Sequence, residues 1–234
     1  MKIFIDAGHN YSGCDTGAQG NGLREQDITF IIAKKLRDLL KNDGHAVKMS
    51  RNALTDNIGT TLNESLKKRV QMSNDWGAEL FISLHTNAGG GKGTETYVYS
   101  TKSGAMTYAQ KIQKSIVQNL GMTDRGVKAS PDLYVLANTK APALLVETAF
   151  IDNIADAYDL ANHPEKFAFA IYEGITGKES TFTTELTEVN DIVWELMQRD
   201  IVTDKELWLK KLKSDSNSYW LARKALHFIR SNDL

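Results

Sequence analysis

The chain has 234 residues, of which 41% are hydrophobic and 24% are charged, and its formal net charge is −1. These values are typical of an ordinary globular protein and exclude disordered, collagen-like and low-complexity classes. The near balance of 28 basic and 29 acidic side chains provides no strongly basic surface, so we expect no nucleic-acid partner.

The hydropathy pattern also argues against a membrane protein. No stretch approaches the roughly 18 consecutive apolar residues of a membrane span. The first residues lack the apolar core of a signal peptide. We therefore expect no membrane insertion, and synthesis in the cytoplasm without a signal peptide.

Short apolar runs alternate with amphipathic stretches over the first three quarters of the chain. The runs predict β-strands at residues 2–7, 45–50, 80–85, 94–99 and 143–148. Helical spacing of apolar residues predicts α-helices at 27–43, 62–75, 103–120 and 164–175. This alternation is typical of an α/β fold, with a largely parallel sheet covered by helices on both faces.

Glycine and proline divide the chain into two parts. The last of the 17 glycines is Gly177, and the three prolines also precede it. The chain after Gly177 predicts a polar linker at 178–184 and a small all-α domain at 185–234, with helices at 185–199, 204–212 and 217–230. We accordingly predict domain boundaries at 1–177, 178–184 and 185–234.

Four side chains in the first part form a candidate site. His9 and His85 come at the ends of predicted strands, and Glu25 follows a glycine-rich loop. Carboxyl ends of strands are where sites form in open α/β sheets. Glu147 interrupts the apolar run 143–146, where an unpaired charge would be costly.

Two histidines and one glutamate, with a fourth position open, are typical of a catalytic zinc ion, because structural zinc sites favour four closed ligands rich in cysteine. Zinc lowers the pKa of water and polarises a carbonyl, while a nearby carboxylate can accept and return a proton. The residues therefore favour hydrolysis of an amide.

Each residue also has a simpler interpretation. Either histidine could be a hydrogen-bonded structural residue, and Glu25 could complement a helix dipole. Glu147 could form an ion pair with Arg69 or Arg125. The only cysteine, Cys14, could be a nucleophile. The glycines at 89–91 favour a flexible rim beside His85 over a phosphate loop.

The sequence resembles the zinc-dependent N-acetylmuramoyl-L-alanine amidases, which include cell-separation amidases and phage endolysins. The segments that carry the resemblance occur in the family's order over about residues 1–176: Ile5–Asn10, Gly17–Gly20 leading to Glu25, Leu62–Arg69 with Asn74, Phe81–Ala88, Asp124–Lys128 and Leu145–Thr148. Ordered agreement of this kind is more specific than any single motif.

The resemblance implies a single mixed sheet, one zinc ion held by His9, Glu25 and His85, and Glu147 as the catalytic carboxylate. It implies peptidoglycan as the partner, with cleavage between the lactyl group of N-acetylmuramic acid and L-alanine, and an endolysin-like or autolysin-like enzyme that acts on the wall after release. Asn10, Arg69 and Asn87 are expected to contact substrate or support the ligands.

Two other functions stay open at this point. One is a thiol-dependent cell-wall peptidase that uses Cys14, and the other is a non-catalytic wall-binding protein. In the tail, Trp194, Trp208 and Trp220 favour a small aromatic core, although they could also stack on wall sugars. Self-association through the C-terminal helices is a further possibility.

Overall fold

The structure, a computed structural model, describes residues 1–178 and, beyond them, residues 193, 196, 204, 207, 208, 210 and 211. The chain divides into two units, Met1–Ser180 and Thr181–Leu234. The predicted linker and the three predicted tail helices fall almost entirely outside the described residues, as do Trp194 and Trp220. The C-terminal domain and its role in wall binding or self-association therefore stay predictions.

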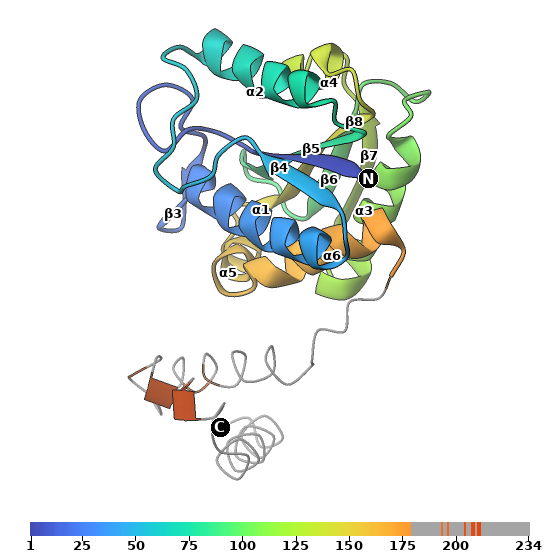
Figure 1. Cartoon of the computed structure of the whole chain (residues 1–234). Helices are drawn as coiled ribbons and strands as arrows, with labels where there is room; N and C mark the ends of the chain where they lie inside the picture. The colour runs from blue at the N-terminus through green and yellow to red at the C-terminus, as the bar shows by residue number, and fades with distance from the viewer. Residues whose placement is uncertain (179–192, 194–195, 197–203, 205–206, 209, 212–234) are drawn as a thin grey trace. The chain divides into compact units, whose positions relative to one another are not determined.

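The first unit is built on a six-stranded sheet in the order β4-β1-β5-β8-β6-β7 (Figure 1). Its strands are β1 (Lys2–Ala7), β4 (Ala46–Met49), β5 (Leu80–Asn87), β6 (Thr94–Val98), β7 (Asp124–Ala129) and β8 (Ala143–Phe150). Neighbours from β4 to β8 are parallel, β8 pairs with β6 in the antiparallel sense, and β6 pairs with β7 in parallel. The expected mixed, mostly parallel sheet is confirmed.

Helices cover both faces of this sheet. One face carries α1 (Glu25–Asn42), α3 (Met106–Leu120), α5 (Ile154–Asn162) and α6 (Pro164–Thr176), and the other carries α2 (Leu62–Trp76) and the short α4 (Tyr134–Asn138) (Figure 1). Within the described part of the chain, no helix has the length and apolar character that a membrane span requires.

Local sequence explains where several helices begin and end. Thr61 accepts a hydrogen bond from the Glu64 amide at the start of α2, and Gly77 ends that helix with φ 69°. Gly121 and Gly177 end α3 and α6 in the same left-handed conformation, and Pro164 opens α6. These are the side-chain cap, the C-terminal glycine and the N-terminal proline that favour helix boundaries.

Alternation along the strands separates two sets of side chains. Ile3, Ile5, Ile82, Leu84 and Val146 belong to the large core under α1, α3 and α6. Phe4, Phe81 and Leu145 point to the opposite face and pack with residues of α2 and α4.

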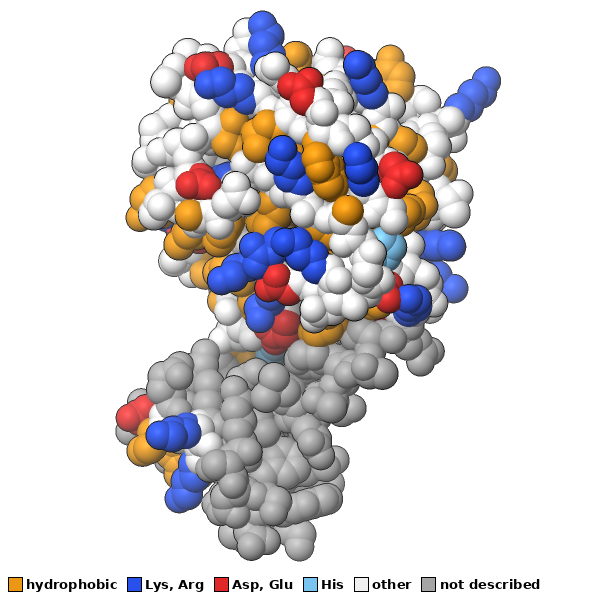
Figure 2. All heavy atoms as spheres, viewed as in Figure 1, with side chains coloured by type: hydrophobic (Ala, Val, Ile, Leu, Met, Phe, Trp, Pro, Cys, Tyr) orange, Lys and Arg blue, Asp and Glu red, His pale blue; other side chains and the backbone are white. Residues whose placement is uncertain are grey.

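Charged side chains of both signs are interspersed over the visible surface of the described residues (Figure 2).

Several elements were not predicted. These are β7, α4, α5 and the small hairpin of β2 (Gln19–Gly20) and β3 (Leu23–Arg24). Strand β7 is a half-exposed edge strand with the sequence DRGVKA, so it lacks the apolar run by which the other strands were recognised. The start of the first predicted helix was also wrong by two positions, because α1 begins at Glu25 itself.

Candidate functional site

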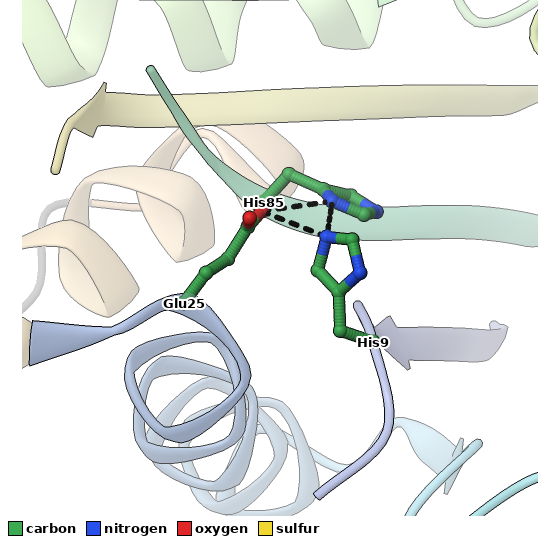
Figure 3. A group of neighbouring side chains, drawn as sticks. All are labelled: His9, Glu25 and His85. Carbon is green, nitrogen blue, oxygen red and sulfur yellow. Dashed lines mark hydrogen bonds and ion pairs between the residues drawn. The ribbon is translucent and has the colours of Figure 1, made fainter. Parts of the chain in front are cut away.

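His9, Glu25 and His85 meet beyond the carboxyl ends of β1 and β5 (Figure 3). His9 follows β1 with a left-handed φ of 66°, Glu25 is the first residue of α1, and His85 lies on β5. The Nε2 atom of His9 and the Nδ1 atom of His85 each lie 3.1 Å from Oε1 of Glu25, and 3.1 Å from each other. The structure thus brings together three residues far apart in the sequence.

This donor set fits a divalent metal ion. Four tetrahedral ligands at about 2.05 Å from a zinc ion lie roughly 3.3 Å apart, close to the 3.1 Å separations observed. Two imidazole nitrogens and a carboxylate oxygen are also the donor types of catalytic zinc. Among the described residues, this is the group of histidine, cysteine and acidic side chains that could hold an ion.

Two glycines allow these side chains to approach one another. A Cβ atom on Gly8 would lie 2.6 Å from Cε1 of His85, and one on Gly17 would lie 2.7 Å from Cδ2 of His9. Gly17 also has φ 75°, which strains any other residue. The glycine-rich loop that precedes Glu25 is therefore a requirement of the site.

Glu25 is held as a buried, charged carboxylate. Its Oε1 accepts from the Thr86 amide at 2.9 Å and its Oε2 accepts from the Ala18 amide at 2.8 Å. Burial would raise the pKa of Glu25, but hydrogen bonds and charge from His85 and His9 outweigh burial and hold it well below its usual range. Ionised carboxylate is the form that binds a metal.

Asp15 fixes the orientation of His9 and was not singled out from the sequence. Its Oδ1 lies 2.8 Å from Nδ1 of His9, so the opposite nitrogen, Nε2, faces Glu25 and His85. Burial lowers the pKa of His9, but Asp15 and Glu25 outweigh this effect and raise it to about 9. A clue existed in the sequence, since Asp15 lies in the glycine-rich loop that also carries Gly17.

Arg69 of α2 holds the segment that carries His9. Its side chain is 2% exposed and donates to Asp6 at 2.6 Å and to the backbone carbonyl of His9 at 2.7 Å. Ser65 donates to Asp15 and accepts from Arg69. These contacts assign Arg69 to support of the ligand loop, one of its two expected roles.

Asn10 also supports the loop. It accepts from the Ile58 amide and donates to the Ile58 carbonyl, which ties the segment after β1 to the chain before α2. The contact is buried, since Asn10 is 0% exposed. Of its two expected roles, the structure therefore favours support over substrate contact.

Glu147 lies beside the metal candidate on the central strand β8. It is in register with His85 of β5 and with Glu95 of β6. Its Oε2 atom is buried and has no hydrogen-bond partner among the described residues. Burial is the main reason that its pKa rises to about 7, a value suited to a group that accepts and returns a proton at neutral pH.

The ion-pair interpretation of Glu147 is wrong. Arg69 pairs with Asp6, and Arg125 pairs with Glu95 at 2.6 Å. Within the described residues, neither arginine forms an ion pair with Glu147. The buried carboxylate is thus left without the cation that a purely structural role would require.

Glu95 forms a second cluster beside Glu147. Its Oε1 accepts from Asn87 at 2.8 Å and from the Tyr97 hydroxyl at 2.7 Å, and its Oε2 accepts from Arg125 and Lys128. From this cluster, the sequence pointed to Asn87 as a candidate site residue and to Arg125 as a possible partner of Glu147, but not to Glu95. Glu95 was missed because, unlike Glu147, it does not interrupt a run of leucine and valine: its strand is rich in threonine and tyrosine, among which a charged residue is not unusual.

Cys14 and the glycine rim at 89–91 lie in two loops near the site. Cys14 is a free thiol whose sulfur accepts from the Asn10 amide group at 3.7 Å, and His9 is engaged by Asp15. The glycine rim is fixed by Asp152, which accepts from the amides of Gly89 and Gly90. The flexibility of this rim stays a prediction.

Comparison with known proteins places these residues in a family. Residues 3–177 match the family described as N-acetylmuramoyl-L-alanine amidase. The chain is 40% identical over 161 residues to a sporulation-specific N-acetylmuramoyl-L-alanine amidase of Bacillus subtilis, covering 68% of this chain and 60% of that protein. It is 39% identical over 164 residues to an endolysin of Bacillus phage SPP1, covering 66% and 56%.

A solved structure gives the same result. The CwlD amidase of Clostridioides difficile, in complex with the GerS lipoprotein, is similar with a TM-score of 0.70 and 29% identity, over 75% of this chain and 96% of that one. The chain spans about 60% of the length of the sporulation-specific relative.

Proposed function

Since this chain belongs to the N-acetylmuramoyl-L-alanine amidase family, we propose that it hydrolyses the amide between the lactyl group of N-acetylmuramic acid and L-alanine in peptidoglycan. One zinc ion is held by His9, Glu25 and His85, in keeping with a family that is generally zinc-dependent. The observation that carries this proposal is the convergence of these three donors beside the unpartnered carboxylate of Glu147.

Glu147 is the proton carrier in this reaction. It accepts a proton from the attacking water as the water oxygen bonds to the carbonyl carbon. It then gives that proton to the amide nitrogen as the carbon–nitrogen bond breaks, which leaves a lactyl carboxyl group and a free L-alanine amine. Bound zinc would polarise the carbonyl and lower the pKa of a water beside it.

Asp15 and Thr86 prepare the ligands for this task. Asp15 directs Nε2 of His9 toward Oε1 of Glu25, and the amides of Thr86 and Ala18 hold the two carboxylate oxygens of Glu25. A carboxylate behind a histidine ligand raises the basicity of that ligand and locks its ring. The same contacts hold two of the three residues that would bind zinc in their present orientation.

The proposal is tested on purified peptidoglycan with the full-length protein. We expect new L-alanine amino groups, no new reducing sugar ends, loss of activity with a chelator and recovery with zinc. Reducing ends would indicate a glycosidase. Inhibition by thiol alkylation together with resistance to chelation would instead favour a peptidase that uses Cys14.

The role of Glu147 is tested with Glu147→Gln, which keeps the size of the side chain. We expect the turnover number to fall by about 10²- to 10⁴-fold, with zinc content and thermal unfolding temperature retained. Asp132→Asn is the control, because Asp132 lies in an exposed turn. Turnover at the wild-type rate in Glu147→Gln would overturn the assignment.

A further inference from the structure

The polar side chains of one sheet face form a row across the strands. His85 of β5 is in register with Glu147 of β8, and Glu147 with Glu95 of β6. Residues directly opposite each other on paired strands point to the same face. Tyr97 lies two residues after Glu95 and is in register with Lys128 of β7, so the row continues to the edge strand.

Arg125 and Lys128 end this row as a cationic pair. Both donate to Oε2 of Glu95, whose side chain is only 4% exposed, while their own side chains are 35% and 39% exposed. Two cations therefore share one buried carboxylate. The pair keeps a net positive charge at the surface, next to Glu147.

The contacts of Arg125 with the described residues involve its Nε atom and the face of its guanidinium group, but not its two terminal amino groups. It donates to Glu95 through Nε at 2.6 Å, and its guanidinium lies 4.8 Å from the centre of the Phe150 ring. Among the described residues, its two terminal amino groups have no hydrogen-bond partner. A guanidinium fixed by Nε and by an aromatic face presents those two groups as a bidentate site for a carboxylate.

The reaction places the leaving peptide on this side of the site. In the proposed function, on which this inference rests, Glu147 protonates the departing amine. The peptide therefore leaves from the Glu147 side of the metal donors, and β6 and β7 lie beyond Glu147 in the sheet order. The glycan side of the scissile bond lies away from them.

We infer that Arg125 and Lys128 form a subsite for a free carboxylate on the stem residue that follows the L-alanine whose amine is released. Glu95 is a positioning residue that holds both cations, and Asn87 and Tyr97 hold Glu95 in turn. This subsite makes the enzyme sensitive to amidation of stem carboxylates, because a primary amide has no negative charge to pair with the guanidinium.

The test uses two purified muropeptides with the same stem, one with a free carboxylate on the residue after L-alanine and one with a primary amide there. We expect the wild-type holoenzyme to favour the free acid by about tenfold in kcat/KM, mostly through KM. In the double variant Arg125→Gln, Lys128→Gln this ratio should fall to near one, because neither muropeptide then meets a cation at the subsite.

Controls separate this subsite from a general loss of structure. Lys128→Gln alone should reduce the ratio in part, because it removes one of the two cations of the subsite. Lys111→Gln removes a charge from the exposed surface of α3 and should leave the ratio unchanged. Zinc content and unfolding temperature are measured for every variant.

The outcomes are distinct. Equal hydrolysis of both muropeptides by the wild type, or a ratio that survives in the double variant, overturns the subsite while amidase activity stands. If the wild type releases L-alanine amines from neither muropeptide nor from peptidoglycan, the proposed function fails and this subsite fails with it.

Discussion

The two ends of a single sheet face differ in what holds them together. At one end, Phe4, Phe81 and Leu145 pack beneath α2 and α4. At the other end of the same strands the side chains are polar: Asp6 is buried against Arg69 of α2, and Glu147 lies in the candidate site. The period of two places all these residues on one face. Residues earlier in the strands pack in the core, and residues nearer the carboxyl ends of the strands lie in or beside the candidate site.

At the polar end, Asp6 is stabilised by an ion pair with Arg69 instead of apolar packing. Asp6 is 1% exposed and accepts from Arg69 and from Ser83. Burial would raise the pKa of Asp6, but Arg69 outweighs it and holds the pKa below its usual value. The loop that carries His9, a proposed metal donor, is thus anchored on a buried ion pair, and the following variants test what this anchoring contributes.

The largest effect is expected for Arg69→Met, which leaves the buried carboxylate of Asp6 without its cation. Breaking a buried pair from one side costs about 3–5 kcal/mol in the free energy of unfolding. Zinc affinity should fall as well, because Arg69 also holds the carbonyl of His9. Urea unfolding and zinc titration measure both, with Lys67→Met on the exposed side of α2 as the control.

The apolar end should respond in stability alone. Phe81 is 0% exposed and stacks on Phe4 with ring centres 5.8 Å apart. Phe81→Ala should cost about 3–5 kcal/mol in the free energy of unfolding, and Phe81→Leu clearly less. Zinc affinity measured on the folded protein should not change in either variant. A large loss of zinc affinity in Phe81→Leu would show that the two ends are not independent.

A smaller effect is expected at Asp15. Asp15→Ala removes the acceptor behind Nδ1 of His9 and should weaken zinc binding by about 10- to 100-fold. Asp15→Asn keeps an acceptor without the charge and should restore part of that loss. Titration against a competing chelator gives the affinities. Unchanged affinity in Asp15→Ala would remove Asp15 from the set of residues that position the ligands.

The smallest effect concerns the acid stability of the Glu95 cluster. Burial would raise the pKa of Glu95, but Lys128, Tyr97 and Arg125 outweigh it and lower the pKa from 4.5 to about 2. A lowered pKa means that the folded state binds fewer protons. The stabilisation by Glu95 is thus complete above about pH 4.5 and is lost as the pH falls toward about 2.

Glu95→Gln tests this pH dependence. The difference in urea midpoint between wild type and variant should shrink as the pH is lowered from about 6 to about 3. Glu79→Gln provides a control on a glutamate outside this cluster. A difference that stays constant over this range would contradict the cause assigned to the shift.

Most strands and helices of the first unit could be predicted, because the apolar runs and helical spacing that indicate them lie within short stretches of sequence. Strands β1, β5 and β8 carry apolar runs, and α1, α2, α3 and α6 have helical spacing and clear ends. Strand β7 escaped because a half-exposed edge strand carries few apolar positions, and helix α5 escaped because it is short and its first apolar side chain, Ile154, is exposed. Pattern alone does not distinguish such segments from loops.

The sequence by itself determined the family, the fold class and the identity of the candidate metal donors and proton carrier, since these rest on ordered motifs and on residue chemistry. Only the tertiary structure decided that Asp15 stands behind His9, that Arg69 pairs with Asp6, and that Glu95 collects two cations beside Glu147. The physical reason is that these contacts join segments brought together by sheet register and loop closure. Their energies depend on burial that no local pattern encodes.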